Sequence, residues 1–243
     1  MRRFLSLLML LAGVATLHAA MVTDSVLMID AGEKLSPRQF EGRDDFHTVR
    51  FRGAVAQLPE CVFSNCGRLR KAILPRGMKK IGRGAFSWCT ALENVQLPVG
   101  LDDIASQAFA YCSALKEITL PATVKHIGAN CFSMCRELES IILPASVDEL
   151  ESYAFSDCTN LRSAVLPANP RQLGELLFSG CGNLREITVD STTPPPFECD
   201  SAPFDAAEET HIYNQCALRV PAAVQGSYAK ARGWNLFRKI LPL

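Results

Sequence analysis

The sequence predicts a repeat solenoid of the α/β type, built from coils of 23 residues. The phrase F-x-x-C-x-x-L recurs at constant spacing without insertion, each copy continues into a short apolar strand pattern, and both ends of the chain depart from the repeat. Regular spacing of about 20 to 29 residues, with leucines at set offsets, is typical of solenoids. The six clear copies begin at Phe63, Phe86, Phe109, Phe132, Phe155 and Phe178.

The coil that starts at Phe86 shows why the pattern predicts these elements. Val95 and Leu97 are two residues apart, which is the period of a strand, so both side chains face the core and Gln96 faces outward. Pro98 cannot donate to a strand ladder and marks the end of the strand, and a glycine two residues later permits a tight turn. One coil cannot close a core alone, so we expect stability to come from stacking.

The turn before each strand carries the cysteines. Ala85, Phe86 and Cys89 are spaced by about one helical turn, which predicts short helical or irregular turns with these side chains inside. A free cysteine behaves as a small apolar residue, so we interpret the repeated cysteines as a column of buried thiols. Disulfides remain the alternative for an exported chain, although equivalent side chains of stacked coils point in parallel. The column is Cys66, Cys89, Cys112, Cys135, Cys158 and Cys181.

Four cysteines lie outside this column. Cys131 stands where other copies have alanine, which predicts a core position, and Cys61 is expected to be partly exposed. Cys199 and Cys216 lie in the tail beyond the repeats, and they form the candidate disulfide if the chain has one.

The first 20 residues predict export. Two arginines precede an apolar stretch, and the segment closes on Ala19 and Ala20, as in a secretory signal peptide. The apolar part is shorter than the roughly 20 residues that a membrane-spanning helix needs, and no later stretch is long enough. The mature chain is therefore expected to be secreted, periplasmic or at the cell surface, with no membrane span. The 25 basic and 25 acidic residues leave no basic stripe for nucleic acid.

No pattern in the sequence predicts catalysis, a cofactor or a metal. His126, Cys131 and Cys135 are close in sequence, but both cysteines already have core places and the histidine falls at an outward turn position. The carboxylate pairs at 102–103 and 148–149 occupy the same turn position as the basic pairs at 79–80 and 125–126. A position that carries either sign of charge indicates a solvated surface, so we predict that the protein is not an enzyme.

The repeat resembles the BspA-type leucine-rich repeat. Its motif LP-x-x-V-x-x-IG-x-x-AF-x-x-C-x-x-L-x-x-I-x-LP covers roughly residues 40 to 190. The resemblance implies a right-handed leucine-rich-repeat coil with a parallel sheet along one face. It also implies an exported or surface protein that binds proteins or surfaces and performs no chemistry. The motif is carried here by Leu120, Pro121, Val124, Ile127, Gly128, Cys131, Phe132, Cys135, Leu138, Ile141, Leu143 and Pro144.

The ends are interpreted as caps. TTPPPF at 192–197 and the segment 218–234 resemble the C-terminal cap of this family, in which a last strand ends at Val220 and Tyr228 and Trp234 cover the open end. The degenerate first copy begins at Phe40, with Arg43 in the cysteine place, and residues 21–39 form either a cap or a disordered leader. We thus divide the chain into a signal peptide (1–20), an N-terminal cap with the degenerate repeat (21–57), the solenoid (58–190) and a C-terminal cap (191–243).

The outward strand positions are the candidate binding face, because solenoids bind along extended faces. Ile142 and Val165 would form an exposed apolar patch there, as at a contact site. Two functions remain open: a binding module for a protein or a glycan-bearing surface, and a structural spacer or envelope component without a specific ligand. A monomer is expected, and the sequence does not name the ligand. The two outward columns are Lys71, Asn94, Glu117, Ser140, Ser163 and Glu186, and Ile73, Gln96, Thr119, Ile142, Val165 and Thr188.

Overall fold

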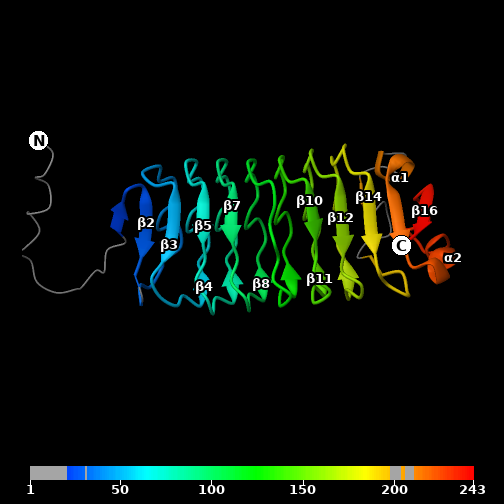
Figure 1. The fold of residues 1–243 in the computed structure, drawn as a ribbon, viewed down its shortest axis with the longest axis horizontal. Coiled ribbons are helices and arrows are strands. Elements are labelled where there is room, and N and C mark those ends of the chain that lie inside the picture. The colour runs from blue at the N-terminus through cyan, green and yellow to red at the C-terminus, as the bar shows by residue number, and fades with distance from the viewer. Residues whose placement is uncertain (1–20, 31, 198–203, 206–210) are drawn as a thin grey trace, which may run out of the picture.

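The computed structural model describes residues 21–30, 32–197, 204–205 and 211–243, so the predicted signal peptide lies outside the described residues. The chain forms an elongated solenoid of about 9 turns spaced by about 23 residues (Figure 1). The predicted repeat solenoid is therefore confirmed.

Two five-stranded sheets follow one another along one side, which we call the strand face. All neighbouring strands in them are parallel except the first pair. The 23-residue period sets the register, so that Lys71 pairs with Asn94 and Ser140 with Ser163. The first sheet comprises β1 (Met21–Thr23), β2 (Val26–Ile29), β3 (Thr48–Phe51), β5 (Lys71–Ile73) and β7 (Asn94–Gln96). The other sheet of the strand face comprises β10 (Ser140–Ile142), β12 (Ser163–Leu166), β14 (Glu186–Val189), β15 (Ala217–Val220) and β16 (Lys239–Pro242).

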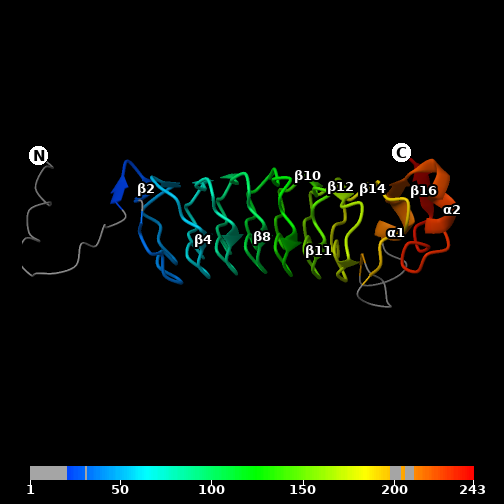
Figure 2. The same ribbon diagram turned by 90° about the horizontal axis from the view of Figure 1, so that it is seen from below.

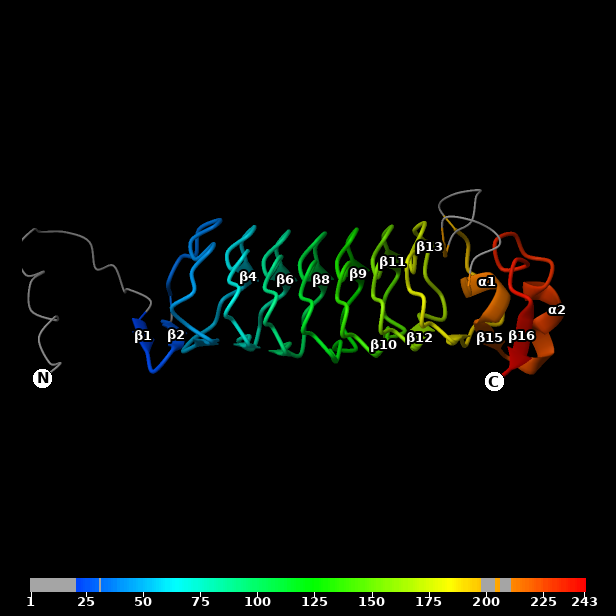
Figure 3. The same cartoon turned by 90° about the horizontal axis from the view of Figure 1, so that it is seen from above.

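Another parallel sheet, built from six strands of two residues each, runs along the opposite side (Figure 3). We call it the second sheet. Each strand presents a polar residue outward and buries an isoleucine or leucine, so every coil contributes a short extended step to both sides. The outward charged positions at 79–80, 102–103, 125–126 and 148–149 were predicted to be solvated turns, and the structure shows that the second residue of each pair is extended and paired between coils. The strands are β4 (Gln57–Leu58), β6 (Lys80–Ile81), β8 (Asp103–Ile104), β9 (His126–Ile127), β11 (Glu149–Leu150) and β13 (Gln172–Leu173).

The turns that carry the cysteines are irregular, and no helix occurs between residues 32 and 197. The one-turn spacing of Ala85, Phe86 and Cys89 therefore reflects consecutive tight turns. Gly84 and Trp88 have positive φ, which lets their N–H groups point along the solenoid axis toward the next coil. The N–H of Phe86 donates to the carbonyl of Ala108 at 2.8 Å, and that of Trp88 donates to Ala110 at 2.8 Å. These hydrogen bonds between coils alternate with bonds inside the turn, such as the one from the N–H of Cys89 to the carbonyl of Phe86 at 3.1 Å.

The core is a continuous stack of phenylalanine rings. Neighbouring rings from Phe40 to Phe178 are nearly parallel, with centroids 5.3 to 5.7 Å apart, and Phe204 extends the stack at 6.1 Å. Each inner ring contacts the ring before and the ring after it, so the coils share one core, as the repeat pattern predicts.

Both ends are closed by segments outside the repeat (Figure 2). At the N-terminus, β1 and β2 form an antiparallel hairpin that turns at Asp24 and Ser25, both with positive φ. Residues 21–29 are thus ordered at the sheet edge, which favours the cap over the leader. Strand stacking already begins at β2, inside the segment predicted to be a cap.

At the C-terminus, α1 (His211–Gln215), the 3-10 helix η1 (Ala222–Val224) and α2 (Gln225–Tyr228) surround the last turns. Tyr228 and Trp234 are buried, and the indole N–H of Trp234 donates to the carbonyl of Pro195 at 2.9 Å. The expected last strand ending at Val220 is β15, but it is not the last: β16 pairs beyond it. The domain boundaries themselves stay a prediction.

Candidate interaction surfaces

The strand face holds both predicted columns in the expected register. None of their twelve side chains is buried. Ile142 is 67% exposed, but Val165 is only half-buried, so the predicted apolar patch centres on one residue. The difference follows from strand pairing, because β12 has a paired strand on both sides whereas β10 is paired on one side only.

The ladder of the strand face is interrupted at residues 117–119, between β7 and β10. Among the described residues, no backbone hydrogen bond joins 94–97 to 117–120. Val95 and Ile118, at the core positions of these two coils, are each 8% exposed, whereas the equivalent Ile141 is 1% exposed. The two coils are therefore less tightly closed here than elsewhere on the face.

A groove of about 440 Å³ lies at this interruption. Exposed amide, hydroxyl and charged side chains line it beside apolar ones, and Val99 at its rim is 86% exposed. The groove was not predicted from the sequence, although five of the residues that line it belong to the two predicted columns. Those five are Lys71, Asn94, Gln96, Glu117 and Thr119.

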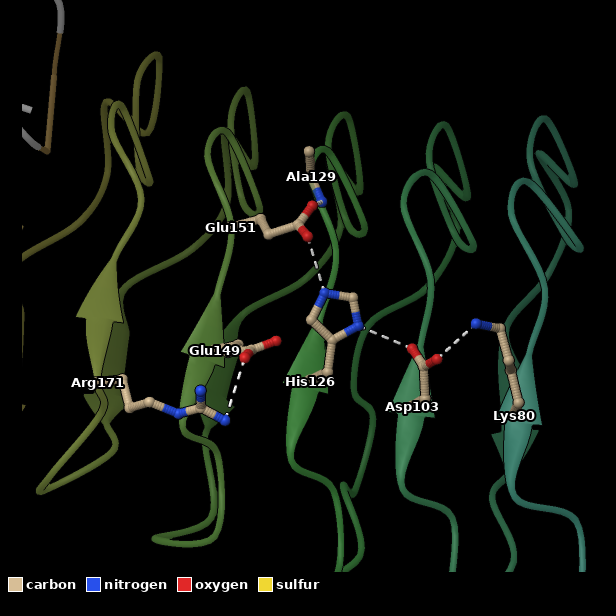
Figure 4. A network of polar contacts seen from close by, with 7 residues as sticks. All are labelled: Lys80, Asp103, His126, Ala129, Glu149, Glu151 and Arg171. Atoms are coloured by element: carbon tan, nitrogen blue, oxygen red, sulfur yellow. Dashed lines mark hydrogen bonds and ion pairs between the residues drawn. The ribbon is translucent and has the colours of Figure 1, made fainter. Parts of the chain in front are cut away.

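The second sheet carries a ladder of charges that alternate in sign from coil to coil. One outward column lies on the strands and runs Lys80, Asp103, His126, Glu149 and Gln172. The other lies at the residues just before the strands and runs Lys79, Asp102, Lys125, Asp148 and Arg171. Ion pairs join neighbouring coils, with Lys80 2.6 Å from Asp103 and Arg171 3.2 Å from Glu149 (Figure 4). If a coil packed against the coil two steps along the chain instead of its immediate neighbour, side chains of like charge would face each other. The alternation of charge therefore favours packing of the coils in chain order.

His126 lies at the centre of this ladder. Its Nδ1 is 2.8 Å from the carboxylate of Asp103 and its Nε2 is 2.9 Å from that of Glu151 (Figure 4). Because carboxylates accept hydrogen bonds, both ring nitrogens donate only when the ring is protonated. Burial lowers the pKa of His126, but the hydrogen bonds to Asp103 and Glu151 outweigh it, so the pKa is raised overall. The histidine contacts these carboxylates rather than Cys131 or Cys135, which lie in the core.

The six column cysteines are buried free thiols in the structure. Each Sγ donates to the backbone carbonyl of the phenylalanine 26 residues earlier, at 3.0 to 3.3 Å. Cysteine thus adds a hydrogen bond between coils to its apolar packing, which the sequence analysis did not foresee. Burial also raises the pKa of the Cys89, Cys112 and Cys135 thiols.

The structure describes three of the four remaining cysteines. Cys131 is buried and Cys61 is half-buried, as predicted from their places in the repeat. Cys216 is buried, but Cys199 lies outside the described residues, so its pairing with Cys216 stays a prediction. Within the described part of the chain, no group of three or more histidine, cysteine or carboxylate side chains is arranged to hold a metal ion.

Comparison with known proteins agrees with this architecture. The sequence pattern described as BspA type Leucine rich repeat region matches six copies over residues 25–112 and 79–194. No curated protein matches the chain. No helix of the described segments has the length and apolar character needed to cross a membrane.

Three solved structures show the same kind of solenoid. A leucine rich repeat protein of T. pallidum is 30% identical over 69% of this chain and 78% of its own, with a TM-score of 0.55. A leucine-rich repeat protein from Bacteroides ovatus is 19% identical over 90% and 66% of the two chains, with a TM-score of 0.57. A leucine rich cell surface protein from Faecalibacterium prausnitzii is 23% identical over 89% and 56%, with a TM-score of 0.56. The chain thus spans little more than half of this last protein, and by its repeats and its fold it belongs to the BspA type leucine-rich repeat family.

Proposed function

We propose that this protein is an exported binding module whose strand face contacts a protein or a glycan-bearing surface. The observation that carries the proposal is the groove at the interrupted ladder, because it breaks an otherwise regular face and because, among the described residues, no backbone hydrogen bond joins 94–97 to 117–120. Buried or half-buried backbone groups favour a hydrogen-bonding partner, and a bound chain or glycan supplies one.

Ile142 supports the same face. It lies on β10, the first strand after the interruption, and its side chain is 67% exposed. Exposed apolar side chains beside amide and hydroxyl groups are the usual composition of a contact surface. The groove and Ile142 together offer one recognition area of polar and apolar character.

Export is part of the proposal. It is supported by the basic and apolar pattern of residues 1–20, and by the similarity to a protein described as a cell surface protein. A structural spacer is the second candidate, and the continuous phenylalanine stack with a cap at each end favours it, since these features make a stiff rod without requiring a ligand.

Affinity capture tests the choice between these functions. Residues 21–243 serve as bait for extracellular matrix proteins, mucins and an extract of the producing cell's envelope. The double variant Ile142→Lys with Val165→Lys is compared with a matched control, Gln57→Lys with Gln172→Lys, which adds the same charge on exposed positions of the second sheet. We expect the strand-face variant to lose capture and the control to retain it.

Two outcomes would contradict the strand-face proposal. Equal loss in both variants would show that added charge, rather than the strand face, weakens capture. Absence of capture by the unmodified chain would favour the spacer. Circular dichroism of each variant confirms that the substitutions leave the fold intact.

A further inference from the structure

A pair of stacked aromatic rings, one exposed and one half-buried, lies on the turn edge, apart from the strand face and the second sheet. The rings of Trp88 and Tyr111 are nearly parallel, with centroids 3.8 Å apart and planes inclined by 8°. Trp88 is 49% exposed. The chain has two tryptophans, and the other, Trp234, is buried in the C-terminal cap. The fold therefore displays its one exposed indole beside a second ring.

The backbone at this position does not favour aromatic residues. Trp88 and Tyr111 have φ values of 64° and 62°, in the left-handed region. The equivalent positions in other coils carry Gly42, Asn65, Asp157 and Gly180, which tolerate this region well, and also Met134, which does not. Positive φ is thus a property of this repeat position, and what distinguishes these two coils is the stacked pair of aromatic rings that they place there.

Among the described residues, the indole of Trp88 stacks on one ring only, that of Tyr111, and it remains 49% exposed. Tyr111 covers one face of Trp88, and in the opposite direction the column continues with Asn65 and then a glycine. A ring bound in that place would extend the stack by one step. Hydroxyl groups lie beside the column at this point: the hydroxyl of Ser113 donates to the carbonyl of Thr90, and an added Cβ on Gly67 would lie 3.9 Å from the hydroxyl of Thr90.

We propose that Trp88 and Tyr111 form a second binding surface that holds a neutral sugar ring of a glycan. The apolar C–H face of a pyranose packs against the electron-rich face of an indole, and its hydroxyl groups match the amide of Asn65 and the hydroxyl of Thr90. The two rings, the amide and the hydroxyl that carry this proposal are themselves uncharged, so they match a neutral ligand and supply no cation for a sulfate or phosphate group. This surface does not depend on the strand face and would act beside it.

The indole itself reports on binding. Because Trp234 is buried, a ligand stacked on Trp88 changes the fluorescence of this residue selectively. An array of neutral and sulfated glycans is probed first with residues 21–243, and the neutral glycans that bind are then titrated in solution. N-acetyltyrosinamide is titrated in parallel as a mimic of a protein side chain.

The variant Trp88→Asn separates binding from folding. Asparagine occupies the equivalent position in the preceding coil and suits positive φ, so the variant is expected to melt at the same temperature or higher. Its affinity for the neutral glycans, measured by calorimetry, is expected to fall about tenfold or more. Trp88→Phe keeps a ring and is expected to bind between the two.

The result is decisive in either direction. Binding of neutral glycans that is lost in Trp88→Asn and retained in the Ile142/Val165 double variant supports the proposal independently of the strand face. No neutral glycan bound on the array, equal binding by Trp88→Asn, or a fluorescence change with N-acetyltyrosinamide alone would overturn it.

Discussion

Replacing His126 with glutamine is predicted to remove a contribution to stability that depends on pH. The imidazolium donates to Asp103 and Glu151 at 2.8 and 2.9 Å, and so joins three successive coils. Glutamine keeps the length of the side chain but carries no charge. Exposed ion pairs are worth about 0.2–1 kcal/mol each, and the ring and both carboxylates are only partly buried, so we expect a total near 1 kcal/mol.

The direction of the pH dependence follows from the three pKa shifts. The pKa of His126 is raised above its ordinary 6.5, because the two hydrogen bonds outweigh burial. Its contribution is therefore complete below about pH 6.5 and is lost as the pH rises through the raised value. Burial raises the pKa of Asp103 and Glu151, but the hydrogen bonds that they accept outweigh it, so both pKa values lie below their ordinary 3.8 and 4.5. Asp103 accepts from His126 and Lys80, and Glu151 accepts from His126 and the N–H of Ala129. Their contribution is lost as the pH falls through those lowered values.

The network is thus predicted to stabilise most between about pH 5 and 6.5. Urea unfolding of the original chain and of His126→Gln, followed by circular dichroism at pH 5.5, 7.0 and 8.5, measures the difference in free energy of unfolding. We expect about 1 kcal/mol at pH 5.5 and a value near zero at pH 8.5. A difference that is independent of pH, or that grows toward pH 8.5, would refute the protonated bridge. In a chain that already carries Asp103→Asn, the loss of stability caused by His126→Gln at pH 5.5 should be smaller.

Two further predictions concern the packing between coils. Gly128→Ala would place a Cβ 2.3 Å from the backbone nitrogen of Ser106 in the preceding coil, so we expect a loss of about 1–3 kcal/mol in urea unfolding. Gly182→Ala, whose Cβ meets nothing within 4 Å, is the control and should leave stability nearly unchanged. The six column thiols should resist alkylation at pH 8 until denaturant is added, whereas the half-buried Cys61 should react first. Mass spectrometry counts the alkylated cysteines, and rapid alkylation of the column in native buffer would contradict its burial.

Much of the fold could be predicted from the sequence because the repeat constrains it. Val95 and Leu97 face inward at the period of a strand, and identical spacing in every coil places equivalent residues in register. The second sheet was harder to foresee. Its strands are two residues long, too short for an alternating pattern, and the charge pairs at 102–103 and 125–126 resemble solvated turns when each coil is considered alone.

The groove could not be predicted from local sequence. Residues 117–119 have the sequence EIT, and the same three residues begin β14, where they pair on both sides. Whether a segment pairs with the adjacent coils depends on the exact positions of those coils. The alternation of apolar and polar residues within the segment does not encode those positions. The thiol hydrogen bonds were missed for a related reason: the acceptor lies 26 residues away, in the preceding coil.

The most direct test of the proposed function is photocrosslinking from the strand face to a captured partner. A photoreactive phenylalanine analogue is placed at Ile142, and in a separate chain at Lys125, an exposed residue just before β9 of the second sheet. Both chains are irradiated with the envelope extract and matrix proteins, and adducts are identified by mass spectrometry. The strand-face proposal predicts a defined adduct from position 142 and none from position 125. An adduct from position 125 alone, or none from either position while capture persists, would contradict it.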